Sequence, residues 1–272
     1  KQKNGEFRKW ILNVRSNDKI LNYLNDPNLK VFSQVGPITP DHVIRLKPKP
    51  LIINLHDIKF NLIDKFINNK INKYRSDYKK YFLANKKYTN NPKKLDSNPR
   101  LLLMPGIGLI GIGRTAKEAK IVSDLAECAI DVILKAESFG KFTSISNKEI
   151  FKVEYWSLEQ AKLKNLNRGS LTGNITVISG GCGTIGLAIA KKFFQEGAEI
   201  VLLDNNIKNI NSTPNDVKNF ATIIKCDVTN QTNVKKVFQI ICEKLGGIDI
   251  LISNAGAPWQ GNIGNVSNSI LK

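Results

Sequence analysis

Three glycines in the second half of the chain have the spacing of a phosphate-binding turn. Gly181, Gly183 and Gly186 follow a short apolar run and precede a segment with helical apolar spacing. Glycines in this Gly-x-Gly-x-x-Gly pattern allow a tight turn, a close approach of the backbone to a pyrophosphate, and contact between helix and strand. The positive N-terminal end of the helix then stabilises the anion. The turn therefore indicates a site for a dinucleotide.

A carboxylate at the end of the next apolar run strengthens this interpretation. Asp204 stands where a carboxylate accepts hydrogen bonds from the adenosine ribose hydroxyls and repels a 2′-phosphate. The sequence thus favours NAD over NADP. The alternative is that the glycines form a purely structural turn and that Asp204 caps a loop. It is the weaker hypothesis, because strand, turn, helix, strand and carboxylate follow in the order that dinucleotide binding requires.

Two further polar segments follow the next two apolar runs. Asp227 and Val228 come after the third run, where a carboxylate can face adenine, and Asn254, Ala255 and Gly256 come after the fourth. Each segment alone is more typical of ordinary loop chemistry. Ligands of open α/β sheets bind at the carboxyl ends of the strands. In this order, both segments fit one cofactor site.

The elements that must position these residues alternate regularly between strand and helix. Apolar strands that are separated by helices predict a parallel sheet with crossover connections. The expected strands are residues 175–179, 199–203, 221–225 and 248–253, and the expected helices are residues 185–196 and 231–245.

Together these motifs resemble the N-terminal part of the short-chain dehydrogenase/reductase family. The glycine turn, Asp204, the CDV of residues 226–228 and the SNAG of residues 253–256 occur in the family's order. The resemblance implies a Rossmann-type sheet and an NAD cofactor. It also implies which residues line the cofactor: Gly180, Ile185, Asp204, Asp227, Val228 and Asn254.

The turn itself departs from the family's T-G-x-x-x-G-x-G pattern at two positions. Ser179 replaces the threonine, and Thr184 stands where the middle glycine is expected, while Gly180 and Gly186 match. The second departure affects the backbone path near the pyrophosphate. It leaves the Gly-x-Gly-x-x-Gly pattern of the neighbouring positions unchanged.

The family's chemistry depends on a serine and a Tyr-x-x-x-Lys pair, in which the lysine lowers the pKa of the tyrosine. No tyrosine of this chain has a lysine four residues later. We therefore assign no catalytic residue and expect this stretch of chain to be inactive alone. Because it begins at Lys1 and ends in NVSNSILK without a closing element, we expect a fragment that is truncated at both ends.

Composition limits the remaining classes of function. The chain has 272 residues and a formal net charge of +18, which would suit an anionic partner. Lysine greatly outnumbers arginine, and asparagine and isoleucine are heavily used, so we interpret the charge as compositional drift and expect no nucleic-acid partner. No apolar run is long enough for a membrane span. The four cysteines form no Cys-x-x-Cys, which favours a reducing, cytoplasmic location.

The first half of the chain predicts a mixed set of elements. Thr115 and Glu118 form a capping box for a long helix that ends near Gly140. The polar segment NLNRGSLTGN is the expected domain boundary. Apolar spacing predicts further helices over residues 7–23, 63–82 and 153–164, and strands over residues 51–55 and 101–104.

Four segments of this half, placed ahead of a dehydrogenase-like part, resemble bifunctional aldolase/dehydrogenases of the rhamnulose-1-phosphate aldolase/alcohol dehydrogenase type. They are SQVGPITPDHVIRLKPKP, YRSDYKKYF, PGIGLIGIGRTAKEAKIVSDLAE and FKVEYWSLEQAKL. The resemblance implies the C-terminal part of a class II aldolase/adducin-like α/β domain over residues 1–165. A linker over residues 166–173 and the first half of a doubly wound parallel sheet over residues 174–272 would follow.

The same resemblance implies an activity. The dehydrogenase half would oxidise a small aldehyde or alcohol, such as lactaldehyde, with NAD, and the aldolase-like half would cleave a sugar phosphate with bound zinc, in sugar catabolism. The zinc ligands would lie upstream of Lys1, so no metal ligand is assigned, and a homo-oligomer is expected for the full-length protein. Two other classes stay open: a dinucleotide-binding module without turnover, and a basic nucleic-acid-binding protein.

A few residues of the first half could meet an anionic substrate. Asp41, His42, Arg45 and Lys47 lie close together in the sequence. An isolated histidine, however, is more often satisfied by neighbouring loop groups than used as a ligand. The glycines of residues 106–113 could likewise bind a phosphate, although the packing of a strand–helix turn is the favoured role.

Overall fold

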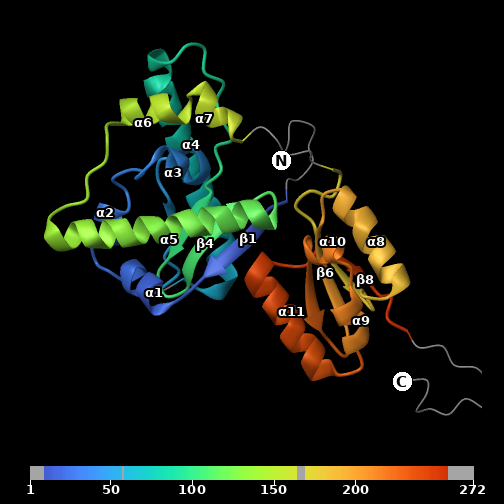
Figure 1. Ribbon diagram of the computed structural model, residues 1–272. Coiled ribbons are helices and arrows are strands. Elements are labelled where there is room, and N and C mark those ends of the chain that lie inside the picture. The colour runs from blue at the N-terminus through green and yellow to red at the C-terminus, as the bar shows by residue number, and fades with distance from the viewer. Residues whose placement is uncertain (1–8, 57, 164–168, 257–272) are drawn as a thin grey trace, which may run out of the picture. The chain divides into compact units, whose positions relative to one another are not determined.

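The computed structural model describes residues 9–56, 58–163 and 169–256, and the structural statements below concern these residues. The chain divides into two compact units (Figure 1). The N-terminal unit comprises residues 12–166, and the C-terminal unit comprises residues 167–272 together with residues 1–11. Among the described residues, no helix combines the length and the apolar character that crossing a bilayer requires.

A four-stranded sheet in the order β1-β4-β3-β2 forms the centre of the N-terminal unit. β2 runs parallel to β3, whereas β3 and β4 are antiparallel, with Leu102 opposite Ile110. The strands are β1 (Ile11–Arg15), β2 (Leu51–Ile52), β3 (Leu101–Met104) and β4 (Gly108–Gly113). The helices are α1 (Asp18–Leu24), α2 (Leu29–Phe32), α3 (Pro40–Leu46), α4 (Ile63–Asn85), α5 (Ala116–Phe139), α6 (Asn147–Glu154) and α7 (Ser157–Ala161), with 3₁₀ turns at Phe60–Leu62 and Lys86–Tyr88.

The predicted helix over residues 7–23 is wrong in the part that the structure describes before Asn17. Residues Ile11–Arg15 form β1, which is hydrogen-bonded to β4, and only Asp18–Leu24 are helical. The side chain of Asn17 accepts a hydrogen bond from the N–H of Ile20 and so caps α1. Apolar spacing along the chain could not show this strand, because its partner lies far away in the sequence.

The other predicted elements of this unit are mostly confirmed. α4 covers the predicted helix over residues 63–82, and β3 covers the predicted strand over residues 101–104. The predicted strand over residues 51–55 is shorter, because β2 ends at Ile52. The predicted helix over residues 153–164 is divided, since α6 ends at Glu154 and the chain is extended at Trp156 before α7 begins.

The glycine-rich segment after β3 forms a further strand, and its glycines pack against the helix that follows, which is the role favoured over phosphate binding. It forms β4 and pairs with β3 along its first residues. A Cβ atom on Gly111 would overlap the carbonyl oxygen of Ala119, and one on Gly113 would overlap the backbone nitrogen of Ala119. Glycine at these positions therefore allows α5 to lie directly against β4.

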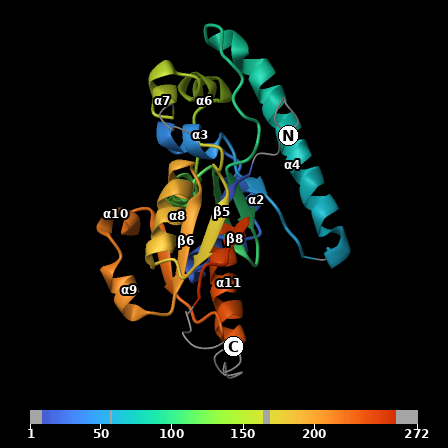
Figure 2. The same ribbon diagram turned by 90° about the vertical axis from the view of Figure 1, so that its right-hand side faces the viewer.

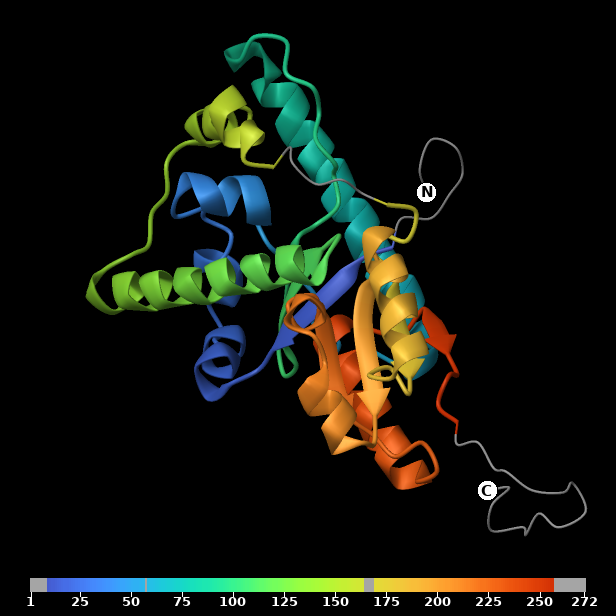
Figure 3. The same cartoon turned by 45° about the vertical axis from the view of Figure 1, so that its right-hand side comes forward.

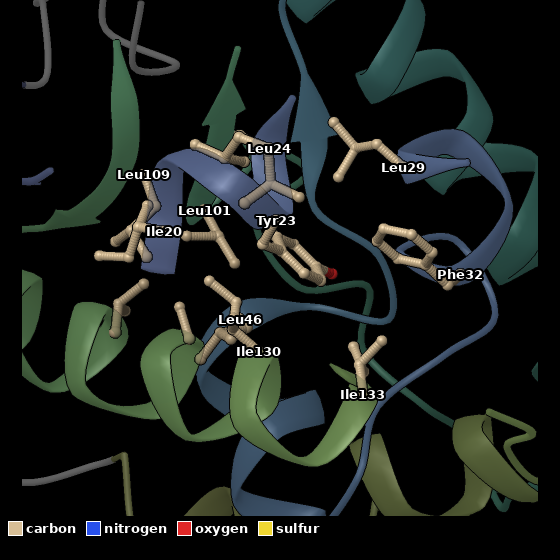
Figure 4. Packing of buried hydrophobic residues seen from close by; sticks show 13 residues of the cluster. Ile20, Tyr23, Leu24, Leu29, Phe32, Leu46, Leu101, Leu109, Ile130 and Ile133 are labelled. Carbon is tan, nitrogen blue, oxygen red and sulfur yellow. The ribbon is translucent and has the colours of Figure 1, made fainter. Parts of the chain in front are cut away.

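The long helix α5 closes the main core of this unit. Thr115 accepts a hydrogen bond from the N–H of Glu118, and the Glu118 carboxylate accepts one from the N–H of Arg114, so the predicted cap is confirmed. Apolar side chains of α5 then face α1 and β3 (Figure 4). This cluster includes Ile20, Tyr23, Leu24, Leu101, Leu103, Leu109, Val122, Ala126, Ile130 and Ile133.

The C-terminal unit contains the parallel sheet that the alternation predicted. Its strands follow the order β7-β6-β5-β8, and every neighbouring pair is parallel. Figures 2 and 3 show this unit from two further sides, with β5, β6 and β8 labelled in Figure 2. The strands are β5 (Ile175–Ser179), β6 (Glu199–Asp204), β7 (Ala221–Lys225) and β8 (Ile250–Ile252). The helices are α8 (Thr184–Gln195), α11 (Gln231–Leu245) and the short α9 (Ile207–Ser212) and α10 (Asn215–Lys218), which were not predicted.

Candidate functional site

The glycine turn lies between the end of β5 and the start of α8, at the carboxyl edge of the parallel sheet. Gly180 has a φ of +60°, in the left-handed region that glycine adopts without strain. A Cβ atom on Gly186 would lie 2.6 Å from the carbonyl oxygen of Gly180, so the helix can start this close to the turn only without a side chain there. Gly183 provides no capping side chain, and the first N–H groups of α8 can therefore serve an anion.

Asp204 is the last residue of β6 and is hydrogen-bonded to the glycine turn. Its Oδ2 accepts a hydrogen bond of 3.1 Å from the N–H of Cys182, and its Oδ1 accepts one of 2.9 Å from the N–H of Asn206. The residue is 7% exposed. Carboxylate oxygens accept more than one hydrogen bond, so Asp204 can both hold the turn and receive a ribose hydroxyl. The link to Cys182 was not predicted from the sequence.

A single hydroxyl, that of Ser179, joins the glycine turn to the end of β8. Its Oγ accepts hydrogen bonds from the N–H of Asn254 at 2.9 Å and from the N–H of Ala255 at 3.1 Å. The amide Nδ2 of Asn254 donates back to the carbonyl oxygens of Ser179 and Gly180, at 3.0 and 3.1 Å. Asn254 therefore holds the turn in shape. The sequence marked Ser179 only as a replacement for threonine and did not predict this role.

Asp227 and Val228 form the exposed turn after β7. Oδ1 of Asp227 accepts hydrogen bonds from the N–H and the hydroxyl of Thr229, at 2.9 and 2.7 Å. These bonds lower the pKa of the Asp227 carboxyl, which is therefore ionised at neutral pH. The turn thus presents a fixed carboxylate at the same edge of the sheet as Asp204.

The remaining predicted cofactor residues lie at this edge as well. Ile185 is 68% exposed on the first turn of α8, and Ala255 and Gly256 are exposed after β8. Gly181 lies beside β6, where a Cβ atom would be 2.9 Å from the side chain of Leu202. The structure thus places every predicted cofactor residue at the carboxyl ends of β5, β6, β7 and β8. Their contacts with a cofactor stay a prediction.

In the N-terminal unit, His42 is engaged by internal groups. Its Nδ1 lies 2.8 Å from the hydroxyl of Thr39, and its Nε2 lies 3.1 Å from the carbonyl oxygen of Leu125. The carbonyl can only accept, so Nε2 carries the proton and Nδ1 accepts from Thr39. Burial lowers the pKa of His42 and keeps it neutral. The structure therefore favours the structural role over contact with a substrate.

Lys47 is also internal. Its side chain is 5% exposed, and Nζ lies 3.1 Å from Oη of Tyr78 and 3.5 Å from Oε1 of Glu154. Tyr78 donates a hydrogen bond of 2.7 Å to the same Oε1, and the Tyr155 hydroxyl lies 2.9 Å from that of Tyr78. Burial lowers the pKa of Lys47 to about 8 and raises that of Glu154. Lys47 thus links α3 to α4 and α6 and is not exposed to an anionic substrate.

Metal binding finds no support in the described part of the chain. It contains no group of three or more His, Cys, Asp or Glu side chains that could hold an ion.

Two protein families match consecutive parts of the chain. Residues 1–163 match the family described as aldolase class II, second domain, and residues 174–271 match the short chain dehydrogenase family. A solved short chain dehydrogenase from Mycobacterium smegmatis is 25% identical over 39% of this chain and 46% of its own, with a TM-score of 0.34.

Two curated relatives illustrate the similarity. The uncharacterized oxidoreductase YuxG of Bacillus subtilis is 31% identical over 259 residues, which is 92% of this chain but 37% of that protein. The probable NADP-dependent mannitol dehydrogenase of Yarrowia lipolytica is 35% identical over 97 residues, which is 35% of each. The chain thus spans little more than a third of the curated relatives that it matches.

Proposed function

Since the chain belongs to the family of class II aldolase second domains and continues into a short-chain dehydrogenase domain, we propose that its C-terminal unit binds NAD. The oxidation of a small aldehyde or alcohol, such as lactaldehyde, in sugar catabolism is the reaction that this binding would serve. The bound NAD would supply the hydride acceptor. The residues of this chain would bind and orient it.

The observation that carries the proposal is the position of Asp204. Its carboxyl group ends β6 and accepts a hydrogen bond from the N–H of Cys182 in the glycine turn, at an edge where a ribose would lie. A carboxylate there favours the two ribose hydroxyls of NAD and repels the 2′-phosphate of NADP. Because the Yarrowia relative is named as NADP-dependent, the preference between the two cofactors is the point to test.

The fit of the cofactor rests on the close packing that the glycines allow in the turn. A Cβ atom on Gly186 would overlap the carbonyl oxygen of Gly180, and one on Gly181 would overlap Leu202 of β6. The pyrophosphate would lie at the start of α8, the ribose at Asp204, and adenine near Asp227 and Val228. Asn254 would keep the turn in shape.

The test is calorimetric titration of the 272-residue chain with NAD and with NADP. We expect tighter binding of NAD, and a loss of about tenfold or more for Asp204→Asn, because a hydrogen bond to a charged group contributes about 1.5–3 kcal/mol. The ratio of the affinity for NAD to the affinity for NADP should also be smaller in Asp204→Asn than in the unmodified chain. Asp216→Asn is the matched control, since Asp216 pairs with Lys191 on the surface. An unchanged preference in Asp204→Asn would contradict the proposal.

A dinucleotide-binding module without turnover is the second candidate, because no Tyr-x-x-x-Lys occurs in the chain. The two candidates differ in whether the full-length protein forms NADH when it is given NAD and lactaldehyde. NADH formation supports the dehydrogenase, and NAD binding without any turnover on small aldehydes or alcohols supports the module.

A further inference from the structure

Asn233, on the first turn of α11, is bonded to the turn that follows β7. Its side-chain Oδ1 accepts a hydrogen bond of 2.7 Å from the backbone N–H of Asp227. Its own N–H donates to Oδ1 of Asn230, the residue that caps the helix, at 2.9 Å. The side chain thus fixes the main chain of the exposed turn to the rigid start of a helix.

This anchoring leaves one acceptor and one donor of the turn available. Thr229 occupies Oδ1 of Asp227 with two hydrogen bonds, so Oδ2 can accept from a ligand. The N–H of Val228 has no partner among the described residues, and Val228 is 46% exposed. An acceptor next to a donor complements the edge of adenine, which offers an amino group as donor and N1 as acceptor.

We propose that Asn233 is a positioning residue for adenine recognition, which acts by holding the backbone of Asp227 and Val228 in the orientation that reads the base. The inference rests on the proposed binding of NAD by this unit. It goes beyond it by assigning the choice of base to a side chain that does not touch the cofactor.

The experiment compares NAD with its hypoxanthine analogue, in which a carbonyl oxygen replaces the amino group and N1 carries a proton. The donor and acceptor positions of the base edge are thereby reversed. We expect the whole chain to bind NAD more tightly than the analogue, and Asn233→Ala to reduce this preference about five- to tenfold, as expected for one lost hydrogen bond. Asn233→Asp keeps an oxygen that accepts from the Asp227 N–H, and it should retain the preference.

Gln239→Ala is the matched control on the same helix, because the Gln239 side chain bonds only to Glu243 in the described structure. A preference for NAD that is as large in Asn233→Ala as in the unmodified chain overturns the inference, even if the variant is less stable. An equal loss of affinity for both dinucleotides also overturns it. Failure of the unmodified chain to bind NAD refutes the proposed function itself, which is a separate outcome.

Discussion

The burial of Lys47 beside Glu154 predicts a contribution to stability that rises in alkaline solution. The pKa of Lys47 is lowered from 10.5 to about 8, so between these values the folded chain has released a proton that the unfolded chain still binds. Stability rises with pH wherever the unfolded state binds more protons. For this single group, the free energy of unfolding should rise by about 2 kcal/mol between pH 7 and about pH 9.5.

The measurement is urea-induced unfolding, followed by circular dichroism at constant ionic strength. Burial raises the pKa values of Cys182, Cys226 and Tyr78, and these groups lower the stability as the pH rises because the folded chain keeps protons that the unfolded chain releases. Lys47→Met combined with Glu154→Gln removes both buried charges and keeps these groups. The free energy of unfolding of the unmodified chain, relative to this double variant, should therefore rise by about 2 kcal/mol across the window. The double change is chosen because Lys47→Met alone leaves a buried carboxylate unpaired, at a cost of about 3–5 kcal/mol.

Lys49→Met is the control, because Lys49 lies two residues further on and its side chain is exposed. It should follow the unmodified chain. A difference between the unmodified chain and the double variant that does not grow with pH would refute the assignment of the proton release to Lys47.

Two further predictions concern the C-terminal unit. The hydroxyl of Thr176 is buried in β5 without a hydrogen-bond partner among the described residues, so Thr176→Val should raise the free energy of unfolding by about 1 kcal/mol. The control is Thr222→Val, at an exposed position, which should change the free energy of unfolding by less than about 0.5 kcal/mol. Equal effects of the two substitutions would contradict the argument. Gly186→Ala should cost about 1–3 kcal/mol and abolish NAD binding, because its Cβ would lie 2.6 Å from the Gly180 carbonyl oxygen. Gly183→Ala, whose Cβ would lie 3.4 Å from the same atom, should be much milder in urea unfolding and in calorimetry.

The C-terminal unit could be predicted largely from the sequence, because each of its main elements is marked by a pattern within its own segment. Each strand is a short apolar run, each helix has its own period, and the parallel sheet follows from their alternation. All four strands and both long helices lie where the spacing placed them. The short helices α9 and α10 were missed, because each has too few residues for a helical period to appear.

The missed features depend on partners that lie far away in the sequence. β1 is a strand because it pairs with β4, which lies far along the chain, and no local pattern encodes that pairing. Lys47 lies in a segment whose charged residues suggested contact with an anion. In the structure, its Nζ lies 3.5 Å from Oε1 of Glu154, which belongs to α6. The role of the Ser179 hydroxyl depends on the pairing of β8 with β5, which brings the N–H of Asn254 within hydrogen-bonding distance.

The hydrogen bond between Ser179 and Asn254 bears on the order in which the glycine turn forms during synthesis. The glycine turn leaves the ribosome first, but Asn254, which holds it, lies 75 residues beyond Ser179. Until β8 has joined the sheet, the turn has its hydrogen bonds to Leu203 and Asp204 of β6 but lacks those to Asn254 and Ala255. A nascent chain that already contains every glycine of the turn therefore still lacks part of the support that holds the turn in shape.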